Sequence, residues 1–174
     1  MKLRLDKIQD EPFSWQEDLR FRREDLDRPE LAELSPLSWQ GRLSRLEQGF
    51  YLQGTFTYRQ TLQCDRCLEP FEQSIEDRLD LLVVEGPPPG GPSEHHLQAE
   101  DLGVVYVEDH ELDTEPLLFE QVQINIPMKP LCRPECAGLC PHCGADLNAG
   151  ACSCAEETDD TRWAALATLR DRLS

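Results

Sequence analysis

Eight cysteines are the feature of this 174-residue chain that most restricts how it can fold. Six of them fall within residues 132–154, and the other two, Cys64 and Cys67, form a CxxC motif well upstream. Thiolates spaced two or three residues apart bend the backbone around one ion, and zinc takes four such ligands in closed structural sites. The eight cysteines can therefore close two sites of four thiolates each.

The compartment decides whether these cysteines are metal ligands or disulfides. The chain has no run of 18 apolar residues, and residues 1–10 alternate charged residues with leucine and show no apolar signal-peptide core. We therefore expect a cytoplasmic protein without a membrane segment. Thiols are kept reduced in the cytosol, so the close spacing indicates metal ligands.

The spacing also suggests how the cysteines are shared. The run Cys140-Pro141-His142-Cys143-Gly144 is a zinc-knuckle sequence, and Cys152-Ser153-Cys154 adds two thiolates soon after it. One predicted set is thus Cys140, Cys143, Cys152 and Cys154. By elimination the second set is Cys64, Cys67, Cys132 and Cys136, which would fasten a turn between strands to the start of the cysteine tail.

Other arrangements remain open at this point. Cys132 and Cys136 can instead join Cys140 and Cys143, one zinc ion can leave four thiols free, and an iron–sulfur cluster would use the same ligands. A catalytic zinc keeps an open position and usually has nitrogen or oxygen ligands. Sulfur ligands alone therefore favour a structural Zn²⁺ ion.

Residues 37–84 carry the clearest strand pattern. Apolar and polar residues alternate along this segment, with a turn signal at Gln48-Gly49 and a second turn at the CxxC motif. The pattern predicts an antiparallel meander with one dry face and one wet face. The dry face would contain Leu37, Trp39, Leu43, Leu52, Phe56, Tyr58, Leu62, Phe71, Ile75, Leu79, Leu81 and Val83.

Helices are predicted at three places. Ser14 and Glu17 fit a capping box and favour a short helix within residues 14–34. Glu115-Pro116 is expected to open a second helix with proline at its first position. The stripe of Trp163, Leu166, Leu169 and Leu173 predicts a terminal helix over residues 161–173.

These elements predict an α+β fold with an antiparallel β-meander core, short helices and a cysteine-rich zinc-binding C-terminal segment. The expected parts are an acidic β-rich core over residues 1–128, the zinc-binding segment over 129–155 and the C-terminal helix over 156–174. A disordered loop is expected at 86–101, where GPPPGGPSEHHLQAED contains four prolines and three glycines. His95 and His96 in this loop are expected to be exposed to solvent.

The charge is strongly negative and unevenly distributed. The formal net charge is −17, and residues 46–128 carry 17 acidic but only 3 basic residues. Such a surface repels nucleic acid and attracts basic proteins. We expect the partner-binding residues to lie in this acidic β region, at Glu69, Glu72, Glu76, Asp77 and Asp80, of which Glu72, Glu76 and Asp80 are expected on the wet face.

Patterns typical of enzymes were not found. The sequence has no phosphate-binding loop, no dinucleotide-binding glycine motif, no nucleophile elbow and no HExxH motif. The Cys64–Cys67 motif is expected between strands, whereas a redox CxxC opens a helix. We therefore expect a protein that is not an enzyme and has no small-molecule substrate.

Two segments together resemble a known family. Residues 54–70, with the run Cys64-Asp65-Arg66-Cys67-Leu68-Glu69-Pro70, look like the core motif of the YceD-like family of large ribosomal RNA subunit accumulation proteins. Residues 131–148, followed by Cys152-Ser153-Cys154, resemble the cysteine tail of many bacterial and plastid members, although some members lack much of this tail. The similarity covers roughly residues 35–155.

The resemblance implies a small non-enzymatic factor needed for normal levels of large-subunit ribosomal RNA. Genes of the family usually lie beside a gene for a small large-subunit ribosomal protein. With the charge argument, this favours a basic ribosomal protein or a large-subunit precursor particle as partner. The alternative is a zinc-dependent RNA-binding protein, since zinc knuckles bind single-stranded RNA and Arg20, Arg22, Arg23, Arg133, Arg162, Arg170 and Arg172 could gather on one face.

Overall fold

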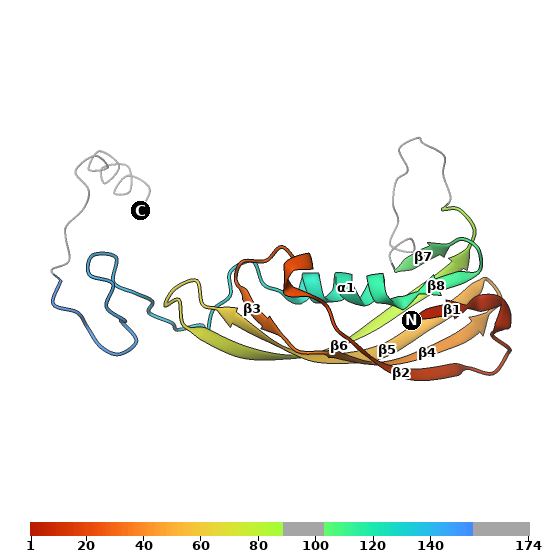
Figure 1. The fold of residues 1–174 in the computed structure, drawn as a ribbon, viewed down its shortest axis with the longest axis horizontal. Coiled ribbons are helices and arrows are strands. Elements are labelled where there is room, and N and C mark those ends of the chain that lie inside the picture. The colour runs from red at the N-terminus through yellow and green to blue at the C-terminus, as the bar shows by residue number, and fades with distance from the viewer. Residues whose placement is uncertain (89–102, 155–174) are drawn as a thin grey trace, which may run out of the picture.

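A computed structural model describes residues 1–88 and 103–154 of the chain. The described residues are mostly sheet with one α-helix, an α+β architecture (Figure 1). Its elements are β1 (Lys2–Arg4), the 3-10 turn η1 (Leu5–Lys7), β2 (Phe13–Leu19), the 3-10 turn η2 (Arg23–Asp25), β3 (Leu31–Leu34), β4 (Leu37–Leu46), β5 (Gly49–Gln63), β6 (Pro70–Glu85), β7 (Val104–Val107), β8 (Glu111–Asp113) and α1 (Thr114–Asn125).

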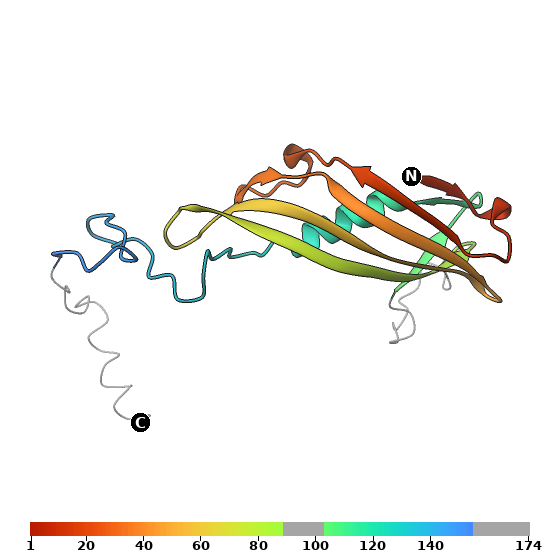
Figure 2. The same ribbon diagram turned by 90° about the horizontal axis from the view of Figure 1, so that it is seen from below.

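The main sheet is built on three long consecutive strands. β4, β5 and β6 pair antiparallel with their neighbours in the chain, and the β5–β6 ladder alone runs from Phe50 opposite Val83 to Gln63 opposite Pro70. β2 pairs with β4, and β3 pairs with β5 beyond the end of β4. β7 adds a parallel pairing to the far end of β6, which the sequence pattern did not predict. The result is a long, twisted sheet with the β5–β6 turn at one end (Figure 2).

The core lies between the sheet and α1. The predicted alternation on β4 and β5 is confirmed, because the apolar positions of both strands are buried. We call the side of the sheet that faces α1 the inner face (Figure 1). Its fully buried side chains are Leu37, Trp39, Leu43, Leu52, Phe56, Leu62 and Val83, and α1 packs Leu118, Val122 and the following Ile126 against the same cluster.

The start of α1 differs slightly from the prediction. The helix begins at Thr114, with Asp113 as its N-cap accepting a hydrogen bond from the Glu115 N–H at 3.2 Å. Pro116 is therefore the third helical residue, where its missing N–H is still not needed by the helix. β8, which leads into α1, pairs with β1 in a small separate sheet.

The helix predicted within residues 14–34 is wrong. Ser14 and Glu17 lie in β2, where Trp15, Glu17 and Leu19 alternate as half-buried residues with exposed neighbours. β2 forms seven register pairs with β4, from Phe13 opposite Leu43 to Leu19 opposite Leu37. This long-range pairing overrides a local capping signal worth about 1 kcal/mol.

Some sequence predictions lie outside the described residues. These are most of the 86–101 loop with His95 and His96, and the helix predicted over 161–173. Among the described helices, none is long and apolar enough to cross a membrane.

Candidate metal centre

Four cysteines from two distant segments meet at the end of the sheet. Cys64 and Cys67 lie in the β5–β6 turn, and Cys132 and Cys136 lie in the chain that follows α1. We call this set the turn cluster. The Cys64 and Cys136 sulfurs are 3.8 Å apart, as are those of Cys67 and Cys132. Cys64, Cys67 and Cys136 are buried against Phe71 and Leu131, whereas Cys132 is exposed.

The β5–β6 turn is shaped to present its two sulfurs to the same point. The Cys64 N–H donates to the Glu69 carbonyl at 3.0 Å, and the Leu68 N–H donates to the Cys64 carbonyl at 2.9 Å. Leu68 takes a left-handed conformation with φ of 62°, a position where glycine is usual. The two strands therefore close into a tight knuckle around Cys64 and Cys67.

Backbone contacts hold the tail against this knuckle. The Asp65 N–H donates to the Pro130 carbonyl at 2.9 Å, and the Leu139 N–H donates to the Arg66 carbonyl at 3.0 Å. The Arg66 guanidinium in turn donates a hydrogen bond of 2.8 Å to the Cys136 carbonyl. The turn cluster is thus assembled by a docking interface as well as by its sulfurs.

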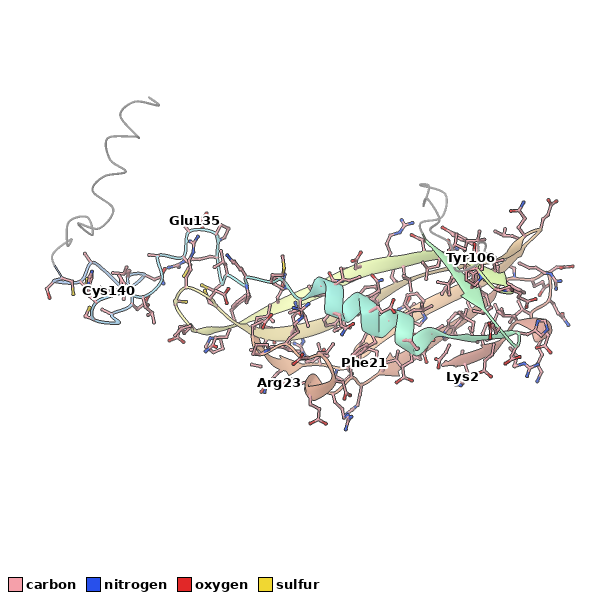
Figure 3. All side chains as sticks on the ribbon, turned by 90° about the horizontal axis from the view of Figure 1, so that it is seen from above. Lys2, Phe21, Arg23, Tyr106, Glu135 and Cys140 are labelled. Atoms are coloured by element: carbon pink, nitrogen blue, oxygen red, sulfur yellow. The ribbon has the colours of Figure 1, made fainter. Side chains whose placement is uncertain are left out.

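The remaining four cysteines form a second set within the tail. Cys140, Cys143, Cys152 and Cys154 bring their sulfurs within 4.8 Å of one another, and we call them the tail cluster. The Cys140 N–H donates to the Ala145 carbonyl at 2.8 Å, and the Gly144 N–H donates to the Cys140 carbonyl at 2.9 Å. Gly144 has a φ of 72°, the left-handed conformation expected after the second cysteine of a knuckle. The labelled Cys140 lies farther out along the tail than Glu135 (Figure 3).

Asn148 connects the two clusters and was not predicted as a site residue. Its side-chain oxygen accepts from the Arg133 guanidinium at 2.8 Å and from the Ala137 N–H at 2.9 Å. Its side-chain nitrogen lies 3.5 Å from the Cys136 sulfur. Arg66 and Asn148 act on backbone carbonyls and a sulfur of another segment, so no local spacing in the sequence points to them.

The geometry of both clusters fits a tetrahedral ion. Four sulfurs at about 2.3 Å from one zinc ion stand about 3.8 Å from each other. The two 3.8 Å contacts of the turn cluster match this value, and the 3.4 Å between Cys140 and Cys152 is somewhat shorter. Each set of four thiolates would fill a tetrahedral shell, which suits a structural ion rather than an open catalytic one.

The pKa values of the cysteine thiols also fit binding of a cation. Burial opposes the Cys64 thiolate, but N–H groups of Cys67, Cys132 and Arg66 together lower the pKa of that thiol to about 6. The N–H groups of Cys143 and His142 lower the pKa of Cys140 to about 6. Without a cation, desolvation of the Cys132 sulfur beside the thiols of Cys136, Cys67 and Cys64 raises the pKa of Cys132 to about 12. Each cluster therefore contains one thiol with a lowered pKa, and binding of a divalent ion must displace the proton of a thiol with a raised pKa such as Cys132.

A glycine pair provides a test of tail docking. A Cβ at Gly138 would lie 2.9 Å from the Arg66 carbonyl oxygen, whereas a Cβ at Gly144 would meet nothing within 4 Å. Both residues have positive φ, which costs alanine about 1 kcal/mol. Gly138→Ala should therefore weaken tail docking by about 2 kcal/mol or more, whereas Gly144→Ala should destabilise only the tail cluster, by about 1 kcal/mol.

The measurement is the rate at which a chromophoric chelator removes metal from each variant. We expect Gly138→Ala to speed loss from the turn cluster and Gly144→Ala to affect the tail cluster alone. Equal effects of the two variants on the turn cluster would mean that the Gly138–Arg66 contact does not hold the tail.

The acidic residues predicted to bind a partner all lie along or beside β6. Glu72, Glu76 and Asp80 are on the outer face, and Asp80 accepts a hydrogen bond from the Tyr51 hydroxyl at 3.1 Å. Asp77 stands opposite Phe56 and so lies on the inner face, although it is exposed. Glu69 lies in the knuckle, where its backbone carbonyl accepts a hydrogen bond from the Cys64 N–H.

The outer face is less acidic than predicted. On β4, β5 and β6 its acidic residues Glu72, Glu76 and Asp80 share the face with three arginines, which are Arg42, Arg59 and Arg78. The alternation along β6 correctly predicted which of its residues share the outer face. It could not predict which residues of the neighbouring strands lie beside them on that face. Acidity instead continues past β6, because residues 79–128 contain no lysine or arginine.

Comparison with known proteins identifies relatives over most of these elements. The family model described as "Large ribosomal RNA subunit accumulation protein YceD" matches residues 52–170. An uncharacterized protein of Mycobacterium tuberculosis is 30% identical over 128 residues, which cover 74% of this chain and 59% of the relative. No solved structure matches the chain significantly.

Two plant relatives carry a descriptive name. Both are called large ribosomal RNA subunit accumulation protein YCED homolog 1, chloroplastic. The maize protein is 28% identical over 54% of this chain and 40% of its own length, and the Arabidopsis thaliana protein is 26% identical over 65% and 42%. The chain thus matches less than two thirds of the length of these relatives. Because the family model covers more than half of the chain and includes both knuckles, this chain belongs to the YceD family of large ribosomal RNA subunit accumulation proteins.

Proposed function

We propose that this protein is a non-enzymatic factor that supports accumulation of large-subunit ribosomal RNA by binding a basic ribosomal protein or an assembly intermediate. The support for the ribosomal role is membership of the YceD family, together with the descriptive names of the plant relatives. The same role argues for an accumulation or assembly factor rather than an enzyme.

The observation that carries the choice of partner is the charge around β6. Glu72 and Glu76 are exposed on its outer face, and Asp77 is exposed on its inner face. Arg78, the one basic residue among them, is engaged by Asp80 at 2.6 Å. From Leu79 to Met128 the chain then has no lysine or arginine to offset the acidic residues. Such a surface attracts a cationic protein and repels phosphate.

The RNA-binding alternative has less support because several arginines are already used within the protein. Arg22 forms a double contact with Asp25 and pairs with Glu24, and Arg66 binds the tail carbonyls. Arg133 binds Asn148. Arg162, Arg170 and Arg172 of the predicted cationic face lie outside the described residues.

We further propose that each cysteine cluster holds one Zn²⁺ ion with a structural role. The ligands would be Cys64, Cys67, Cys132 and Cys136 in the turn cluster and Cys140, Cys143, Cys152 and Cys154 in the tail cluster. A bound Zn²⁺ ion supplies a rigid link between thiolates and no open position for chemistry. In this proposal the ions fix the tail beside the acidic β6 strand.

Charge reversal tests the proposed partner surface. We expect a Glu72→Lys and Glu76→Lys double variant to bind purified large-subunit precursor particles and basic ribosomal proteins on the order of tenfold more weakly at low salt. The matched control is Glu47→Lys with Glu120→Lys, which changes the net charge equally at exposed sites away from the outer face of β6. The measurement is a pull-down over a salt series.

The cellular readout is the ratio of large-subunit to small-subunit ribosomal RNA in a strain that lacks the native gene. The β6 variant should fail to restore this ratio, whereas the control variant should restore it. If the deletion leaves the ratio unchanged, the ribosomal role is excluded. If both variants bind and restore equally, the acidic surface is not the partner site.

A further inference from the structure

The edge of β6 is open along the acidic segment. β5 pairs with one side of β6 from Pro70 to Val83, but β7 pairs with the other side only at residues 82–85. Among the described residues, no strand pairs with the second side of residues 71–79. β6 accordingly runs along one long edge of the sheet, from the knuckle toward β7 (Figures 2 and 3). An open strand edge presents unpaired N–H and C=O groups that can pair with another chain.

The open segment has a defined length and two chemically different sides. It is bounded by the knuckle at one end and by β7 at the other, and nine residues are a usual length for a strand. On the inner face Phe71 and Ile75 are half-buried, so apolar surface reaches the edge at these two positions, whereas Gln73 and Asp77 on the same face are exposed. On the outer face Glu72 and Glu76 are exposed. Neighbouring strands place like-facing side chains opposite one another.

We propose that an extended segment of a basic protein binds as an additional strand along residues 71–79 of β6. Its lysine or arginine side chains lie on the outer face against Glu72 and Glu76. Its alternate apolar side chains lie on the inner face against Phe71 and Ile75. This proposal rests on the proposed function, because it specifies how the acidic surface takes its basic partner.

Charge decides against a second copy of this chain as the occupant. Antiparallel pairing of β6 with β6 of another copy about Ser74 would place Glu72 of each chain opposite Glu76 of the other, and like charges directly opposite one another are destabilising. A cationic segment instead gains cross-strand ion pairs at the same positions. Main-chain hydrogen bonds would then supply affinity and the alternating side chains would supply specificity.

The test uses peptides on the intact metal-bound protein. The probe is a labelled octapeptide in which lysine and valine alternate, and the control has the same composition with four lysines followed by four valines. We expect the alternating peptide to bind roughly tenfold more tightly, because only it places all lysines on one face. N-methylation of alternate residues of the same peptide should abolish this advantage by removing main-chain donors.

Hydrogen exchange locates the bound peptide. Binding of the alternating peptide should slow exchange of backbone amides within residues 71–79 and leave the β4–β5 turn unchanged. Ile75→Gln, which removes apolar surface from the inner face beside the edge, should lower affinity for the alternating peptide on the order of tenfold. Ser74→Gln is the matched control on the outer face and should lower it less.

The outcomes separate the two proposals. If both peptides bind equally and lose affinity with Glu72→Lys and Glu76→Lys, the acidic surface binds cations but strand addition is wrong. If neither peptide binds while precursor particles still bind through Glu72 and Glu76, the proposed function stands without this mode. If the protein instead dimerises through residues 71–79, the occupant is a second copy and the proposal is overturned.

Discussion

Replacing Cys64 with serine should remove one metal ion per chain and lower the free energy of unfolding of the sheet by about 4 kcal/mol. The turn cluster joins Cys67 to Cys132 across 65 residues of sequence, and the joined segment includes β6, β7 and α1. A link that closes such a long loop removes much of the entropy of the unfolded chain. Losing one ligand breaks this link.

The control is Cys152→Ser in the tail cluster. It should also remove one metal ion, but all four tail ligands lie within residues 140–154, outside the strands of the main sheet. The unfolding free energy of the sheet should then change by less than about 0.5 kcal/mol. Elemental analysis gives the metal content, and urea unfolding followed by circular dichroism gives the stability. Equal destabilisation by both variants would mean that the turn cluster is not the link between sheet and tail.

The composition of the two clusters was predictable because cysteine spacing is local. The run from Cys140 to Cys143 with Gly144 places two sulfurs on one turn, and Cys152 and Cys154 are the nearest remaining thiols. The structure brings together the same two sets of four that this spacing and elimination suggested. The contacts of Arg66, Gly138 and Asn148 could not be predicted, because they join segments that are distant in sequence and use backbone atoms.

The same difference applies to the strands: patterns within one segment could be predicted, whereas pairings between distant segments could not. In β4 and β5, apolar and polar residues alternate over ten or more residues, and each strand has one dry face. β2 alternates over seven residues only, and a capping signal at Ser14 and Glu17 competes with that pattern. Pairing with β4 determines that β2 is a strand, and no local signal indicates partners that lie 18 to 30 residues away in the sequence.

The periodicity of a strand predicts which residues share a face better than it predicts the net charge of that face, as the acidic residues of β6 show. Glu72, Glu76 and Asp80 were correctly assigned to one side of β6. Asp77 falls on the other side, as its odd spacing from Glu76 requires. The outer face also gains Arg42 and Arg59 from neighbouring strands, so its net charge depends on register and not on β6 alone.

Trp39→Ala should lower the free energy of unfolding by about 3–5 kcal/mol, the usual cost of truncating a buried aromatic residue. Trp39 is fully buried, and its ring lies edge-on to the Trp15 ring with the two ring centroids 6.3 Å apart. It also covers a glycine pair in which Gly41 stands directly opposite Gly54. Trp39→Phe should cost much less, because it keeps an aromatic ring there and removes a buried indole N–H that has no hydrogen-bond partner.

The glycine pair makes this prediction specific to the geometry. A Cβ on Gly41 would lie 2.5 Å from the Trp39 indole nitrogen and 2.5 Å from the Trp15 ring. Gly41→Ala should therefore cost about 1–3 kcal/mol in the native protein through overpacking. In the Trp39→Ala background the same change should cost at least about 1 kcal/mol less, because the cavity left by the indole accepts the new methyl group. Thermal and urea unfolding of the four proteins measure this coupling, and strictly additive costs would show that the indole does not lie over the glycine pair as described. Since β4, β5 and β6 form one continuous ladder, loosening this site should also weaken the strand that carries Glu72 and Glu76.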